Sequence, residues 1–450
     1  MAPLWAAAGM PAAALDWLEL PPGPVVLPSS FRVDEAAQAS IGLAGLAAAA
    51  FHHRRGGPVQ GVSVGRRHAA MEFRSERLLR LDGGPPPDLW DALTGLYAAR
   101  DGWVRLHTIF PHHRAGVLRL LGCAADRERV ARAVAERDAV AFEEEASAAG
   151  MCVTAFRTAA AWAAHPQSAA LAGLPVVGIS RIGDAPPECA PVAARPLGGV
   201  RVLDATRVIA GPVAGRTLAA HGAEVLALTA PHLPFVPPLV MDNNRGKRSA
   251  SLDLRQSDDA VRLEVLVRQA DVFLQGYRPG GLAGLGFGPE RVAALRPGIV
   301  YGSLNAYGPT GPWAGRRGFD SLVQTATGLN ADEMEATGEV LPRVLPAQAL
   351  DHATGYLLAF GVMAALHRRA EEGGSWHVQV SLARTGQWLR GLGRVDGLGA
   401  ADPGEMPDLM EVRASGFGEL QAIRHAAKLD VTPAWYALPS TPLGSAEARF

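Results

Sequence analysis

The sequence has few cysteines and little charge, and both shortages argue against several classes of protein. Its 450 residues include three cysteines, Cys123, Cys152 and Cys189, with no CxxC spacing, so neither a disulfide framework nor a thiolate metal site is indicated. Charged residues make up 19% of the chain and the formal net charge is −1. This charge balance gives no reason to expect nucleic acid or an anionic membrane as a partner.

Long apolar runs are also lacking. No stretch of eighteen apolar residues marks a membrane span, and the first positively charged residue is Arg32, so the start of the chain has no basic leader region. Hydrophobic residues nevertheless make up 48% of the chain, which is typical of a soluble globular protein. We therefore expect a cytoplasmic protein without a membrane partner.

The common cofactor and metal motifs are missing or incomplete. No P-loop occurs, and the turn "AGPVAG" (210–215) departs from G-x-G-x-x-G, which argues against a nicotinamide or flavin. "GVSVG" (61–65) matches the serine-hydrolase elbow, but it belongs to an alternating strand. The histidine pairs at 52–53 and 112–113 lack HExxH spacing, so we interpret them as solvated helix ends and loops. No metal and no resident cofactor are expected.

The chain repeats one segment. Residues 27–64 and 345–382 share Leu-Pro, an Asp six or seven residues later, a helix of small residues, His-Arg-Arg, a Gly-Gly break and a short strand. Basic residues followed by Gly are a typical helix end. Two distant copies indicate a duplication and not a solenoid, whose repeats are short and contiguous.

Helix and strand patterns predict an α/β protein with a doubly wound, mainly parallel, Rossmann-like sheet and a second, smaller α+β domain. Strands expected at 200–203 and 224–228 flank a helix, and the helix-then-strand rhythm continues downstream. The predicted divisions are a truncated duplicate of the segment that carries the second apolar helix (1–95), the small domain (96–190), the Rossmann-like domain (196–395) and a C-terminal return segment (396–450).

One acid stands at the head of the second apolar helix. From Tyr356 to Leu366 there is no charge, so this helix should be buried on all sides, with Asp351 where the chain enters the core. Asp351 is either a plain N-cap or a carboxylate kept ionised by the helix N-terminus because it reacts.

Two further segments carry basic and aromatic residues. "NRGKRSASLDLR" (244–255) is rich in cations, and "QGYRPGG" (275–281) places Tyr277 and Arg278 just past a strand's carboxyl end, where open α/β sheets bind ligands. They indicate a phosphate-rich ligand with an adenine, or else surface cations beside a Gly-Pro turn.

Five motifs in one order resemble the class III CoA-transferase family (CaiB/BaiF type, the formyl-CoA and carnitine CoA-transferase group). They are "PLGGVRVLDATRVIAGPVAGRTLAAHGAEV", "NRGKRSASLDL", "ADVFLQGYRPG", "GLGFGPERVAALRPGIVYGSLNAYGPTGPWAGRRGFDSLVQ" and "ALDHATGYLLAFGVMAAL". The match is collinear over about 196–395. Residues 96–190 look like the family's small domain, here placed before the α/β half.

The resemblance implies a CoA-transferase that moves CoA from an acyl-CoA to a carboxylate acceptor through aspartyl-anhydride and aspartyl-CoA intermediates. Asp351 matches the nucleophile and Asp320 a nearby acid that shapes the site. CoA is then a substrate and not a cofactor, and a homodimer is compatible with the sequence. The implied CoA contacts are Ile209, Ala210, Leu252, Asp253, Leu254, Arg255, Gly276, Tyr277 and Arg278.

Two other functions stay open. A racemase or isomerase would need a proton carrier before the Asp of "GFD", where this chain has Phe319. A non-catalytic CoA-binding or scaffold protein is suggested by the Ala227, Thr229 and Ala230 that replace the family's usual charged residues. In the first repeat, Asp34 matches Asp351, but this repeat has no glycine at the position that corresponds to Gly355. We therefore expect Asp34 to be catalytically silent.

Overall fold

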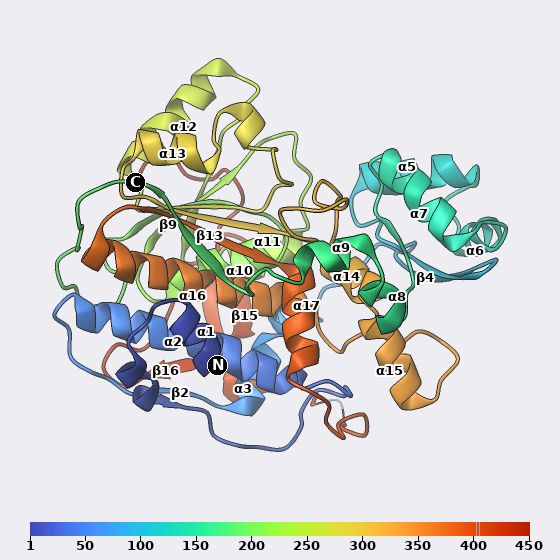
Figure 1. Ribbon diagram of the computed structural model, residues 1–450, viewed down its shortest axis with the longest axis horizontal. Coiled ribbons are helices and arrows are strands. Elements are labelled where there is room, and N and C mark those ends of the chain that lie inside the picture. The colour runs from blue at the N-terminus through green and yellow to red at the C-terminus, as the bar shows by residue number, and fades with distance from the viewer. Residues whose placement is uncertain (402, 405) are drawn as a thin grey trace.

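A seven-stranded sheet forms the centre of the computed structural model, which describes residues 1–401, 403–404 and 406–450 (Figure 1). The strand order is β10-β9-β8-β11-β12-β13-β7, with all neighbours parallel except β7 at one edge. The predicted doubly wound, mainly parallel sheet is therefore confirmed. Its strands are β7 (Gly178–Gly183), β8 (Arg201–Ala205), β9 (Glu224–Thr229), β10 (Lys247–Ser251), β11 (Val272–Gln275), β12 (Val300–Asn305) and β13 (Ser375–Ser381).

Helices cover both faces of this sheet, because successive strand residues point to opposite sides. In β8, Val202 belongs to the core under one set of helices and Leu203 to the core under the other. The first set is α10 (Ala210–Ala220), α11 (Pro237–Asn243), α16 (Ala349–Glu372) and α17 (Leu382–Gly391), and the second is α12 (Ser257–Gln269) and α13 (Pro289–Leu295), with the short η2 (Ala283–Leu285) before it.

The apolar helix of the second repeat, α16, lies inside the molecule as predicted. Among the described residues it is the one helix long and apolar enough to cross a membrane, and its most apolar window is wholly buried. The helix of the first repeat, α2 (Val33–Arg54), packs along it (Figure 1). The two repeats are therefore neighbours in space as well as alike in sequence.

The N- and C-terminal segments wrap around this helix pair. Strand β2 of the first repeat joins β1 and β16 in a three-stranded sheet, and β3 pairs with the β14–β15 hairpin. The N-terminal elements are α1 (Ala2–Ala7), η1 (Ala12–Trp17), β1 (Leu18–Glu19), β2 (Val62–Val64), α3 (Arg66–Glu72), α4 (Ser75–Leu78) and β3 (Arg80–Leu81). The C-terminal elements are η3 (Pro407–Leu409), β14 (Met410–Ser415), β15 (Gly418–Ile423) and β16 (Ala427–Leu429).

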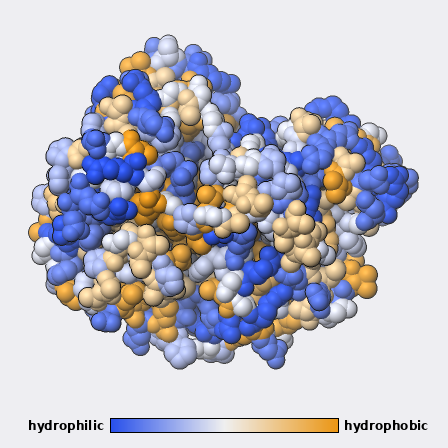
Figure 2. Space-filling model, in the orientation of Figure 1, coloured by the Kyte–Doolittle hydropathy of each residue, from blue (hydrophilic) through white to orange (hydrophobic). Residues whose placement is uncertain are grey.

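A small α+β unit projects from one side, set off from α12 and α13 by a hollow in the surface (Figures 1 and 2). Its own core runs from Leu93 to Ala155. The sequence placed this domain at 96–190, but β7 is a strand of the central sheet, so the small unit ends earlier than predicted. Its elements are β4 (Gly95–Ala99), β5 (Gly102–Leu106), α5 (Pro111–Leu121), α6 (Arg127–Ala135), α7 (Ala139–Ala148) and β6 (Val153–Ala155).

Four short helices connect the small unit to the rest. They are α8 (Ala159–Ala163), α9 (Pro166–Leu171), α14 (Asp320–Ala326) and α15 (Leu329–Thr337). Helix α14 contacts β5, β6, α16 and α17. This position brings the acid at its first residue, Asp320, to the start of α16.

Candidate active site

A cavity of about 590 Å³ lies at the carboxyl ends of the central strands. Its walls come from the segments that follow β8, β9, β11 and β12, where open α/β sheets bind their ligands. The small unit closes one side with Phe110, His112 and His113. Asp351 also lines this cavity, so the acid singled out in the sequence faces a space large enough for a small-molecule ligand.

Asp351 is the third residue of α16 and is 8% exposed. Gln348 occupies the N-cap position, and no side chain of the helix's own first turn caps it. The interpretation of Asp351 as a plain N-cap is therefore wrong.

Asp320 takes the capping role instead. Its Oδ2 accepts hydrogen bonds from the backbone N–H groups of Leu350 (2.7 Å) and Asp351 (2.9 Å). Its other oxygen accepts a hydrogen bond from the Gln324 side chain. The free N–H groups of α16, which attract anions, are thus occupied by a carboxylate from α14.

The pKa of Asp351 lies well above its usual range, because burial disfavours the charged form and the nearby carboxylates of Asp320 and Glu76 repel it. Burial also raises the pKa of Asp320, to about 6. The expectation that the helix N-terminus holds Asp351 in its charged form is therefore wrong, because Asp320 occupies that N-terminus.

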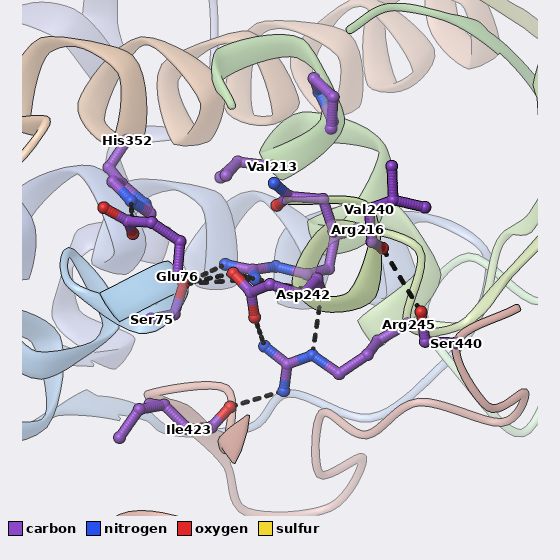
Figure 3. A network of polar contacts seen from close by, with 12 residues as sticks. Ser75, Glu76, Val213, Arg216, Val240, Asp242, Arg245, His352, Ile423 and Ser440 are labelled. Carbon is purple, nitrogen blue, oxygen red and sulfur yellow. Dashed lines mark hydrogen bonds and ion pairs between the residues drawn. The ribbon is translucent and has the colours of Figure 1, made fainter. Parts of the chain in front are cut away.

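Glu76 reaches this site from α4, in the N-terminal segment. Its Oε2 lies 2.9 Å from Nε2 of His352, the residue next to Asp351 (Figure 3). Burial would raise the pKa of Glu76, but the adjacent His352 and Arg77 bring it below its usual range. The negative charge of Glu76 is one of the causes that raise the pKa of Asp351.

Beside Glu76 lies a buried ion network that joins the N-terminal segment to the α/β half (Figure 3). Asp242 pairs with Arg216 (2.6 Å) and with Arg245 (2.7 Å), and accepts a hydrogen bond from Ser75 (2.6 Å). All four side chains are buried. The network fixes α4, and with it Glu76, against α10 and α11.

The turn after β8 forms a strained edge of the cavity. Val208 has a φ of 71°, which is rare for a β-branched residue and is usually maintained only where the surrounding structure demands it. The Asn243 side chain donates a 3.2 Å hydrogen bond to the Val208 carbonyl. The next two residues, Ile209 and Ala210, begin α10 and line the cavity, as the resemblance implies.

Gly355 has a different role from the one expected. A Cβ at this position would lie 2.5 Å from the Ala210 carbonyl oxygen and 2.8 Å from Val213. The glycine therefore lets α16 pack closely on α10, and it is not a gap beside the carboxylate.

The residues implied as CoA contacts fall into two adjoining spaces. Ile209, Ala210, Gly276, Tyr277 and Arg278 line the large cavity with Asp351. A second, mainly apolar pocket of about 200 Å³ shares Tyr277 with it. That pocket is lined by Leu252, Asp253, Leu254 and Arg255.

Several cavity residues were not identified from the sequence. Arg207, His232, Asn305, Arg316 and Arg317 lie on its wall. The Arg-Arg pair directly before "GFD" was the available signal.

Three cations of the cavity wall are available for a ligand. Among the residues that the structure describes, Arg207, Arg278 and Arg317 make no ion pair with a protein acid, although Arg207 donates a hydrogen bond to the Pro234 carbonyl. Such cations suit the phosphates of a nucleotide-bearing ligand.

The interpretation of the histidine pairs as solvated holds for one residue of each pair. His53 and His112 are exposed, whereas His113 is 2% exposed and His52 is 3% exposed. Burial lowers the pKa of the His113 imidazole to about 3, so this wall of the cavity carries a neutral ring.

A doubly wound sheet with an acid at its carboxyl edge defines an α/β enzyme-like site, and comparison with known proteins gives the family. The model of CoA-transferase family III matches residues 197–392. An acyl-CoA transferase of Gibberella moniliformis is 30% identical over 408 residues, which cover 80% of this chain and 70% of that protein. The chain belongs to CoA-transferase family III.

Other relatives match over a shorter span. The "Probable fatty acyl-CoA transferase Rv3272" of Mycobacterium tuberculosis is 38% identical over 202 residues, which cover 42% of this chain and 51% of that protein. Its crystal structure has a TM-score of 0.41, at 36% identity over 44% of this chain and 58% of that chain. An acetyl-coenzyme A transferase of Hypoxylon pulicicidum is matched over 35% of its length, at 38% identity and 45% of this chain. The chain thus spans about half or less of these two proteins.

Proposed function

We propose that the protein transfers CoA from an acyl-CoA to a carboxylate, with Asp351 as the nucleophile. The observation that carries this proposal is a buried carboxylate, with no side-chain hydrogen bond of its own among the described residues, on the wall of a cavity at the strands' carboxyl ends. A desolvated carboxylate with a raised pKa is a stronger nucleophile once it loses its proton.

In the proposed reaction, a carboxylate oxygen of Asp351 attacks the thioester carbonyl. The C–S bond breaks, CoA thiolate leaves and a mixed anhydride forms. The thiolate then attacks the Asp351 carbonyl, which gives an aspartyl-CoA thioester and releases the donor acid as a carboxylate. The acceptor carboxylate reverses both steps, so Asp351 is regenerated and each intermediate is of similar energy.

The surroundings of Asp351 suit such intermediates. Helix α16 is buried along its length, so water has little access from behind the carboxylate. On the cavity side, Arg278 and Arg317 offer positive charge for CoA phosphates. Tyr277 lies between the large cavity and the apolar pocket, where an aromatic base can be buried.

The test is a single substitution with a covalent readout. Asp351→Asn should fold, bind CoA and transfer nothing. Wild-type protein treated with its acyl-CoA and then with hydroxylamine or borohydride should carry a mass change on the Asp351 peptide. An Asp351→Asn enzyme that is active, and free of deamidation back to Asp, would contradict the assignment.

A second function is favoured by one observation. A third, smaller pocket, of about 30 Å³, is lined by both His107 and Asp351. The His107 ring stacks on Phe319 at 3.9 Å between centroids. Phe319 itself cannot carry a proton, but the fold brings the His107 imidazole from another segment to its side. Proton exchange at the substrate's α-carbon in D₂O, without CoA transfer, would favour a racemase or isomerase.

A further inference from the structure

The small pocket of about 30 Å³ adjoins the large cavity, and the two spaces share Val208, Ile209, Phe319 and Asp351 in their walls. Its walls are mainly apolar. They are formed by Leu89, Trp90, Ile109, Ile209, Leu239 and Phe319.

The size of this pocket sets a limit on what enters it. A cavity of about 10–15 Å³ by the same measure holds one water, so this one holds roughly two to three atoms of that size. That is enough for the tail of an acyl group of about three carbons. The large cavity remains for the far longer CoA portion.

The charges around the pocket set a second limit. Three carboxyl groups, those of Asp351, Asp320 and Glu76, line it, and no Lys or Arg side chain does so in the part of the chain that the structure describes. The nearby Arg105 lies over the Trp90 ring, 6.0 Å from its centroid, and is not part of the lining. A second carboxylate on the acyl tail would sit among like charges in a poorly hydrated space.

We propose that this pocket receives the acyl tail, so that the donor and acceptor acids are short, uncharged monocarboxylic acids and not dicarboxylic acids. The inference rests on the proposed function and specifies its substrate class. Five of its twelve lining residues, at positions 76–109, lie outside the segment matched by the family model. Chain-length selection would then depend partly on the N-terminal segment and the small unit.

The first experiment measures binding of inert thioethers by calorimetry, which needs no turnover. S-propyl-CoA should bind at least about tenfold more tightly than S-(2-carboxyethyl)-CoA or S-hexyl-CoA, since a misplaced methylene or charge commonly costs that much. Equal or tighter binding of the carboxyethyl analogue would overturn the inference.

The second experiment uses one variant that enlarges the pocket and one that reduces it. Trp90→Ala enlarges the pocket and should improve the affinity for S-hexyl-CoA relative to S-propyl-CoA by about tenfold. Ile109→Phe narrows the pocket and should lower the affinity for S-propyl-CoA while leaving the affinity for free CoA unchanged. Trp435→Ala is the matched control, because Trp435 is 48% exposed and does not line the pocket. An unchanged chain-length profile in both pocket variants would overturn the inference.

The two proposals fail in different ways. If Asp351 is labelled by acyl-CoA but dicarboxylic thioesters are preferred, the substrate class is wrong and the proposed function stands. If S-propyl-CoA binds selectively while Asp351→Asn keeps full activity, the nucleophile is wrong. If neither CoA nor any thioether binds, both are wrong.

Discussion

The backbone N–H of Asp351 donates a 2.9 Å hydrogen bond to the carboxylate of Asp320. The two acids therefore have different tasks, since Asp320 caps α16 while the side chain of Asp351 stays free to face the cavity. The arrangement places a negative charge beside the proposed nucleophile and makes the titration of the pair interdependent.

Activity should depend on this pair at acid pH. Asp351 must lose its proton to attack, and its pKa is raised by burial, by Asp320 and by Glu76. We therefore expect kcat/KM to rise with pH through an acid limb above the ordinary Asp value of about 3.9. Asp320→Asn removes one negative charge and should move this limb to lower pH. A limb that stays in place or moves upward would contradict the proposed coupling.

The same shifts predict how stability changes with pH. Asp320 has a folded-state pKa of about 6, and that of Asp351 is also raised. Between about pH 4 and 6 the folded state holds more protons than the unfolded state, so the contribution of these groups to the free energy of unfolding falls as pH rises. In urea titrations, the free energy of unfolding of the wild type should therefore fall, relative to that of an Asp351→Asn variant, as pH rises over this window.

Asp34 should have no catalytic role. Its carboxylate accepts hydrogen bonds from the backbone N–H groups of Val26 (2.6 Å) and Leu27 (3.2 Å), and it is not among the residues that line the large cavity. Asp34→Asn keeps an acceptor and should retain turnover. Loss of CoA transfer in Asp34→Asn, with transfer intact in Asp351→Asn, would show that the roles of the two repeats are reversed.

Gly355 should be needed for packing. Gly355→Ala forces a Cβ to within 2.5 Å of the Ala210 carbonyl oxygen and should lower the free energy of unfolding by about 1–3 kcal/mol. Gly391, the exposed last residue of α17, is the control, because nothing lies within 4 Å of its added Cβ. Urea denaturation should show Gly391→Ala unchanged or slightly more stable than wild type. An equal loss in the free energy of unfolding in Gly355→Ala and Gly391→Ala would contradict the packing role of Gly355.

Asp242 should be the most sensitive member of the buried ion network. Asp242→Ala leaves Arg216 and Arg245 buried without their shared carboxylate and should cost about 3–5 kcal/mol in urea denaturation. Glu128→Ala breaks an exposed pair with Arg132 (3.8 Å) and should leave the unfolding midpoint unchanged. A comparable midpoint in both variants would show that the network adds nothing to stability.

Local patterns were sufficient for much of the architecture. The helix-then-strand rhythm predicted the parallel strands of the central sheet, and the strand expected at 200–203 is β8 (Arg201–Ala205). The uncharged stretch from Tyr356 to Leu366 predicted a buried helix, because a helix with no polar face has no side to turn toward water. These features depend on residues within a few positions of each other.

The chemistry around Asp351 was decided by tertiary structure. Asp320 caps a helix thirty residues further along, Glu76 meets His352 across 276 residues, and Trp90 forms the wall of a pocket beside an acid of another segment. No local sequence pattern predicts these contacts, because they depend on how α4, α14 and the small unit pack around α16. The sequence by itself determined that an acid stands at the head of a buried helix. Only the packing of distant segments decided that the side chain of this acid makes no hydrogen bond to a described residue, lies near other carboxyl groups and faces two cavities.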